Sequence, residues 1–155
     1  QPPGHRRRPG RRGPHLGRRF RRIYPRIRDL RARYGRRLTV RGWTRRVPSY
    51  LAASHVVVGK AGGATVHEVL AAARPMLVNF LLPGQEEGNT RLLEKLGGGR
   101  HVPDARALAA ALREMVEEGG APWRRMHENL LRAGMTGGSG RIADLALKLA
   151  EEHTN

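Results

Sequence analysis

Runs of apolar residues and stretches with helical periodicity alternate along this chain. Four short segments predict strands: LTVRGW from Leu38, HVVVG from His55, PMLVNF from Pro75 and RHVPD from Arg100. The consecutive valines of HVVVG are typical of a parallel strand that is covered on both faces. Because helical segments stand between these strands, the pattern predicts an α/β layer fold with right-handed crossovers.

The helical segments carry recognisable start and stop residues. RIRDLRARYG has Ile27, Leu30 and Tyr34 on one side and ends at Gly35. VPSYLAAS carries Pro48 in its first turn, where proline is favoured. Further helices are predicted at 65–73, 86–96 and 105–118, and two amphipathic helices follow in the last third of the chain.

Positive charge is concentrated at the start of the chain. The formal net charge is +17 over 155 residues, and residues 1–46 supply all of it, with 18 arginines and one aspartate. Residues 1–24 are mostly Arg, Gly and Pro, which predicts a disordered arm ahead of a domain at 25–155. Such an arm is either a solvated tail or a segment attracted to phosphate, in RNA or in anionic lipid headgroups.

Composition excludes several classes of protein. The chain has no cysteine, so disulfides and thiolate metal sites are excluded, and a reduced, cytoplasmic setting is expected. No apolar run approaches the roughly 20 residues of a membrane helix, so any membrane contact is expected to be peripheral. No residue pattern calls for a metal or another cofactor.

The segment GKAGGATVHE, which begins at Gly59, places a glycine loop between a strand and a helix. If Thr65 begins the helix, the free backbone N–H groups of its first turn form an anion site. Gly62 and Gly63 would let the backbone approach a phosphate, and Lys60 or the Thr65 hydroxyl would supplement it. The alternative is purely geometric, since strand-to-helix turns use glycine in any case.

Two further groups of polar residues extend this site. Glu68 is predicted in the first turn of the same helix, where it either stabilises the helix dipole or accepts the two hydroxyls of a ribose. His67 beside it is expected to face solvent. The segment PGQEEGN follows a strand, at the edge where α/β folds bind ligands, and its Gln85, Glu86 and Asn89 suit sugar hydroxyls. The alternative is a polar loop that caps a helix.

These motifs together carry a family resemblance. The stretch VVVGKAGGATVHEVLAAARPMLVNFLLPGQEEGNTRLLEKLGGG resembles the nucleotide-sugar-binding C-terminal domain of GT-B glycosyltransferases. The resemblance is to the group of monogalactosyldiacylglycerol synthase and processive diacylglycerol glucosyltransferase, which is related to the peptidoglycan lipid-II glycosyltransferase. It implies a Rossmann-like parallel sheet flanked by helices, and inverting transfer of a hexose from a UDP-sugar to a diacylglycerol-type lipid, without a required metal.

The resemblance also assigns roles to residues of this chain. Gly62, Gly63, Ala64 and Thr65 would contact the diphosphate, Glu68 the ribose, Gln85 and Glu86 the transferred sugar, and Gly42 and Trp43 the uracil. Asn89 joins this sugar-facing group on its amide chemistry and its place in PGQEEGN, not on the resemblance.

The chain also departs from the family. Arg-rich sequence stands where the family has its first two strands, and no histidine or aspartate matches the catalytic base of the family's acceptor domain. We therefore expect a UDP-sugar-binding part that transfers no sugar alone, with an open sheet edge that favours self-association. The alternative is a non-enzymatic α/β module recruited by its basic arm to RNA or an anionic membrane.

Overall fold

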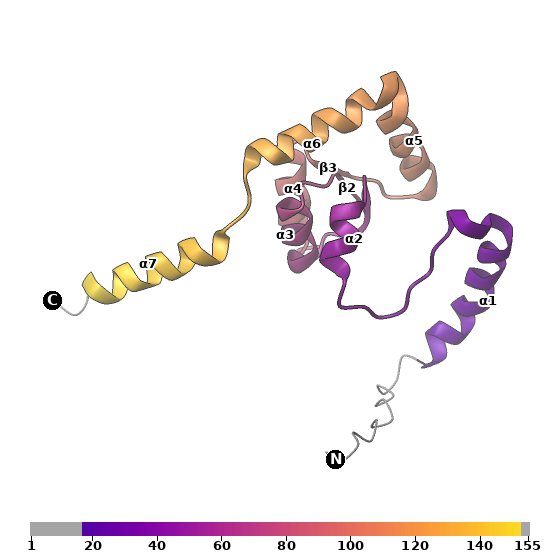
Figure 1. The fold of residues 1–155 in the computed structure, drawn as a ribbon, viewed down its shortest axis with the longest axis horizontal. Helices are drawn as coiled ribbons and strands as arrows, with labels where there is room; N and C mark the ends of the chain where they lie inside the picture. Colours follow the sequence, from indigo (N-terminus) through magenta and orange to yellow (C-terminus); the bar gives the residue numbers. More distant parts are fainter. Residues whose placement is uncertain (1–16, 153–155) are drawn as a thin grey trace, which may run out of the picture. The chain divides into compact units, whose positions relative to one another are not determined.

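The computed structural model describes residues 17–152, with side chains described at Ile23 and from residue 25 onward (Figure 1). The chain divides into two compact units, Gln1–Arg45 and Arg46–Asn155.

The first unit contains α1 (Gly17–Tyr34) and a 3-10 turn, η1 (Gly35–Arg37). The helix was predicted to begin near Arg26, but it begins earlier and passes through Pro25, where the domain boundary was expected. Residues 17–24 of the expected disordered arm are thus helical, whereas residues 1–16 lie outside the described part of the chain.

One predicted strand is wrong. Residues 38–43, LTVRGW, have no regular secondary structure. A strand needs a neighbour that pairs with its backbone groups, and the described residues of the first unit include no other strand.

The second unit contains a three-stranded parallel sheet in the order β1-β2-β3. The strands are β1 (Val57–Lys60), β2 (Met76–Phe80) and β3 (Gly99–His101). The helices are α2 (Val47–Ala53), α3 (Gly63–Ala71), α4 (Glu87–Lys95), α5 (Ala105–Val116), α6 (Ala121–Ala133) and α7 (Gly138–Glu152), with a 3-10 turn, η2 (Glu117–Gly120). The predicted Rossmann-like arrangement of parallel strands and flanking helices is confirmed.

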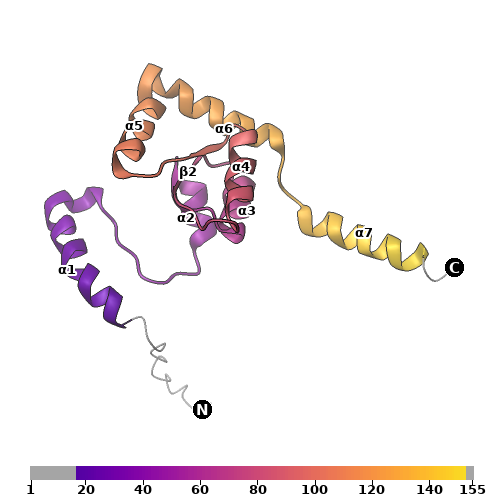
Figure 2. The same ribbon diagram turned by 180° about the vertical axis from the view of Figure 1, so that it is seen from behind.

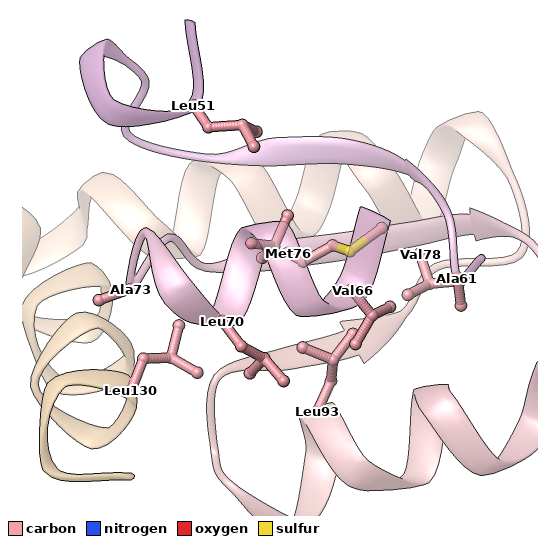
Figure 3. Close-up of a cluster of buried hydrophobic side chains, with 10 residues drawn as sticks. Leu51, Ala61, Val66, Leu70, Ala73, Met76, Val78, Leu93 and Leu130 are labelled. Carbon is pink, nitrogen blue, oxygen red and sulfur yellow. The ribbon is translucent and has the colours of Figure 1, made fainter. Parts of the chain in front are cut away.

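Side chains of β2 alternate between two layers of helices, as the pleat of a strand requires. Met76 and Val78 pack with α3 and α4, in the cluster that Figure 3 shows. Leu77 points to the other face and packs with Ala111 and Met115 of α5. Figure 2 shows the same division from behind, with α3 and α4 on one side of β2 and α5 on the other.

Helix α6 crosses the end of the sheet where the strands begin. Three side chains of α6 each donate a hydrogen bond to a backbone carbonyl, one in each of the three loops that lead into the strands. Trp123 Nε1 donates to His55 O (2.7 Å) before β1, His127 Nδ1 to Ala73 O (2.6 Å) before β2, and Asn129 Nδ2 to Gly97 O (3.2 Å) before β3. The amino end of the sheet is therefore closed by a helix.

Strand β1 forms one edge of the sheet. It pairs only with β2 among the described residues, and Val58 is 42% exposed although its partner Leu77 is fully buried. The open edge is thus present, and self-association through it stays a prediction.

Candidate functional site

The predicted glycine loop, residues 59–63, takes in the last two residues of β1 and the first residue of α3, so the connection itself is Ala61 and Gly62 at the carboxyl end of the sheet. Gly62 is the N-cap, in extended conformation, and no side chain caps the helix. The first backbone bond of α3 runs from Val66 N–H to Gly62 O (2.9 Å). The N–H groups of Gly63, Ala64 and Thr65 therefore have no partner within the helix, which makes this end a suitable anion site.

The PGQEEGN segment, residues 83–89, lies against this loop. A Cβ added to Gly62 would lie 3.7 Å from Glu86 Oε1, and one added to Gly63 would lie 4.0 Å from Asn89 Nδ2. The two polar segments, separated in sequence by α3 and β2, are thus brought together.

An ion pair joins the two segments. Lys60 Nζ lies 2.7 Å from Glu86 Oε1, and the backbone N–H of Leu82 donates to Glu86 Oε2 (3.1 Å). The hydrogen bond from Lys60 lowers the pKa of Glu86, burial opposes it, and the Leu82 N–H adds to the lowering. Glu86 is only 5% exposed. In the structure it links PGQEEGN to Lys60, a role additional to the sugar contact that the resemblance implied.

Asn89 forms the second link between these segments. Its Nδ2 donates to Ala61 O at 2.9 Å, which leaves its side-chain oxygen as an acceptor. Gln85 is exposed in the turn before α4. Gln85 is thus the member of the predicted sugar-facing group that solvent reaches most freely.

Glu68 and His67 lie further along α3 than predicted. The helix begins at Gly63, so Glu68 lies in the second turn, and the prediction of a first-turn position is wrong. Its side chain lines a hollow of about 370 Å³ together with Pro48 and Leu51, near α2. His67 is exposed, as expected, and its Nδ1 donates to Gly63 O (2.7 Å).

Gly42 and Trp43 belong to the first unit. Trp43 is 85% exposed, and the Arg45 guanidinium lies 5.6 Å from the centre of its ring. The uracil contact assigned to these two residues stays a prediction.

Sequence reasoning missed the ion pair between Lys60 and Glu86, because it treated Lys60 as a phosphate ligand only. The sequence indicated only that the two residues lie at one edge of the sheet, because Lys60 ends one predicted parallel strand and Glu86 follows its neighbour. Among the described residues, no group of three or more metal-ligating side chains is placed to hold a metal ion. Within the same residues, no helix has the length and apolar character needed to cross a membrane.

Comparison with known proteins agrees with the family resemblance seen in the sequence. A family model described as the glycosyltransferase family 28 C-terminal domain matches residues 26–141. A probable monogalactosyldiacylglycerol synthase 2 of Oryza sativa subsp. indica is 30% identical over 112 residues, covering 72% of this chain and 20% of that protein.

Two bacterial proteins are similar as well. The processive diacylglycerol beta-glucosyltransferase of Staphylococcus carnosus is 30% identical over 77 residues, covering 50% of this chain and 20% of that protein. A UDP-N-acetylglucosamine–N-acetylmuramyl-(pentapeptide) pyrophosphoryl-undecaprenol N-acetylglucosamine transferase of Rhodospirillum rubrum is 30% identical over 112 residues, covering 68% of this chain and 27% of that protein. The chain spans about a fifth to a quarter of the length of these relatives.

Proposed function

Because the chain belongs to the glycosyltransferase family 28 C-terminal domain family, we propose that residues 46–155 hold the nucleotide-sugar donor of an inverting glycosyltransferase. The donor is a UDP-hexose, and the acceptor is a lipid hydroxyl of diacylglycerol type, by analogy with the similar synthases. One observation carries this proposal: α3 begins without a side-chain cap at the carboxyl edge of a parallel sheet.

The diphosphate lies at the start of α3 in this proposal. The unbonded N–H groups of residues 63–65 donate to its oxygens, and the helix dipole favours its negative charge. During transfer the leaving UDP gains charge, so donors that are already in place stabilise the transition state more than the ground state. The ammonium of Lys60, at the end of β1, lies beside this loop in its ion pair with Glu86.

The ribose and the sugar occupy the two sides of this anion site. Glu68, in the second turn of α3, accepts the ribose hydroxyls, and the hollow beside it gives the nucleoside room. Gln85 and Asn89 bind hydroxyls of the hexose, and Glu86 accepts one further bond through a free lone pair.

This part of the protein transfers no sugar alone in this proposal. Transfer needs a base aligned on the acceptor hydroxyl and a cleft that holds donor and acceptor together. Labelled UDP-glucose or UDP-galactose, incubated with the chain and diacylglycerol vesicles, should therefore yield no glycolipid. Glycolipid formed at an ordinary enzymatic rate, and lost in Gln85→Ala, would contradict this.

Calorimetric titration with UDP tests the donor site through a pair of glycine variants. Gly62 has φ −66° and ψ 143°, which any residue adopts, and an added methyl meets nothing closer than 3.7 Å. Gly62→Ala should thus fold normally, while its methyl blocks close approach of a phosphate. We expect UDP affinity to fall about ten-fold, roughly 1.4 kcal/mol.

Gly140→Ala is the matched control, because its methyl meets nothing within 4 Å and lies in α7. It should bind UDP as the parent chain does. If the parent and Gly62→Ala bound UDP equally and had equal melting temperatures, the diphosphate would not bind at the glycine loop. Binding that is lost steeply with salt but unaffected by uridine competition would instead indicate simple attraction to the arginines.

A further inference from the structure

The described part of helix α1 carries a narrow apolar stripe. Ile23, Ile27, Leu30 and Tyr34 recur at spacings of four, three and four residues, so at 3.6 residues per turn they fall within an arc of about 60°. Ile23, Leu30 and Tyr34 are 51%, 45% and 47% exposed. Three of the four large apolar side chains on this helix face are thus open to solvent, and Ile27 is half-buried.

Positive charge borders this stripe. The sequence of α1 holds eight arginines and one acid, Asp29. Arg26 and Arg33 fall on one side of the stripe and Arg31 on the other, each about 70° to 90° from its midline. All three are exposed, and the Arg33 guanidinium lies 5.5 Å from the centre of the Tyr34 ring. The helix therefore combines an apolar face with basic borders.

This arrangement fits one class of partner. A helix with apolar residues on one face and arginines around it lies in the interface of a bilayer, with its apolar face among the acyl chains. Anionic headgroups then attract the arginines. Single-stranded RNA would need aromatic rings on which bases stack, and the stripe is mainly aliphatic. Charge complementarity together with the aliphatic stripe thus favours an anionic lipid surface.

We propose that α1 is an interfacial helix that binds the chain to the surface of an anionic bilayer. The proposal goes beyond donor binding, because α1 belongs to the first unit and none of its residues is placed in the diphosphate site. Burial of Ile23, Ile27, Leu30 and Tyr34 supplies the apolar contact, and the arginines make the binding selective for anionic lipid.

Sedimentation of the full chain with lipid vesicles tests this proposal. The parent chain should sediment with vesicles of phosphatidylcholine and phosphatidylglycerol but not with phosphatidylcholine alone. The double variant Ile23→Asn with Leu30→Asn keeps every charge and removes half of the stripe. We expect its binding to anionic vesicles to fall about ten-fold or more.

Ala32→Asn is the matched control on the opposite side of the helix. Alanine is the best helix former, so Ala32→Asn lowers helix propensity at least as much as Ile23→Asn or Leu30→Asn does singly. Its vesicle binding should stay within about two-fold of the parent. If only the stripe variant loses vesicle binding, the loss is therefore due to the apolar face and not to a weaker helix.

Three results would overturn the proposal. The stripe variant could bind anionic vesicles as the parent does, which would mean that the arginines act alone. The parent chain could ignore vesicles and bind a fluorescent single-stranded RNA, with no effect of the stripe variant. Finally, the parent could ignore vesicles and elute as a dimer that the stripe variant converts to a monomer, which would make a second copy the occupant.

Discussion

The two ends of the sheet in the second unit are built differently. At the amino end, α6 crosses the three strands, and Trp123, His127 and Asn129 each donate to a backbone carbonyl before one strand. The Trp123 ring also stacks on His127, with centroids 5.1 Å apart. At the carboxyl end two polar links, from Lys60 and from Asn89, join the loops instead.

This difference suggests that the amino end of the sheet serves stability and the carboxyl end serves binding. The amino end is covered by a helix that satisfies backbone groups, so changes there should act on folding. The carboxyl end leaves the first N–H groups of α3 without a partner in the helix or a side-chain cap among the described residues, and a ligand that supplied acceptors would bind there. Ligand sites of open parallel sheets lie at the carboxyl ends of their strands, which agrees with this division.

The largest effect is expected from Trp123→Ala at the amino end. The change removes a ring that packs against the Leu77 cluster and the hydrogen bond to His55 O. The free energy of unfolding, measured by urea titration, should fall by about 3 kcal/mol. UDP affinity of the folded fraction should not change.

Leu131→Ala is the control for this prediction, because Leu131 lies on the same helix and is 58% exposed. Its cost should be below about 1 kcal/mol. Equal costs for the two variants would mean that α6 does not close the amino end in solution, and the contrast between the ends would fail.

Glu68→Ala should give the next largest effect, and it should act on binding alone. Glu68 is exposed, so unfolding should be unchanged, whereas loss of hydrogen bonds from a carboxylate to ribose should cost roughly 1.5 to 3 kcal/mol of UDP affinity. Calorimetry with UDP and with 2′,3′-dideoxy-UDP separates the causes. If Glu68 holds the ribose, the variant should lose little affinity for the dideoxy nucleotide. An equal loss for both ligands would place Glu68 elsewhere.

The strands of the sheet were predictable because their signal is local. Three of the four predicted strands form, at 57–60, 76–80 and 99–101. The first two lie in apolar segments between helices, whereas β3 is the short segment Gly-Arg-His and was predicted from its place between two helices. LTVRGW has a similar apolar content but no described partner strand, and pairing cannot be read from the segment itself. The wrong strand prediction at LTVRGW therefore reflects a tertiary requirement.

The candidate site was predictable in its residues but not in its contacts. The glycine loop and PGQEEGN were identified from spacing, and the parallel sheet brings them together. The pairing of Lys60 with Glu86 depends on side-chain reach across two strand ends, which no spacing encodes. The turn that holds Glu68 shifted because α3 begins at Gly63, two residues earlier than predicted.

A matched pair of asparagines compares the two ends directly. Asn129 donates to Gly97 O (3.2 Å) at the amino end, and Asn89 donates to Ala61 O (2.9 Å) at the carboxyl end. Each change to alanine removes one amide-to-carbonyl hydrogen bond, so each should lower the free energy of unfolding by about 1 kcal/mol. Only Asn89→Ala should weaken UDP binding. If both variants weaken it equally, or neither does, the ends do not differ in function.

The smallest effect is expected from acid, and it concerns the ion pair at the carboxyl end. Lys60 holds the pKa of Glu86 below its usual value of 4.5. Because the pKa is lower in the folded state, the pair contributes stability above about pH 4.5, and that contribution is lost as the pH falls through the folded value. The difference in urea midpoint between the parent chain and Glu86→Gln should therefore be largest near neutral pH and shrink in acid.

The pair of Arg100 and Glu114 provides the control for this titration. Their side chains lie 2.5 Å apart, and Arg100 lowers the pKa of Glu114 in the same direction, but Glu114 is 51% exposed. Salt screens exposed pairs more than buried ones, so added salt should remove the acid dependence due to Glu114 and leave that due to Glu86. Acid dependence that persists unchanged in Glu86→Gln at high salt would show that this pair does not hold the carboxyl end together.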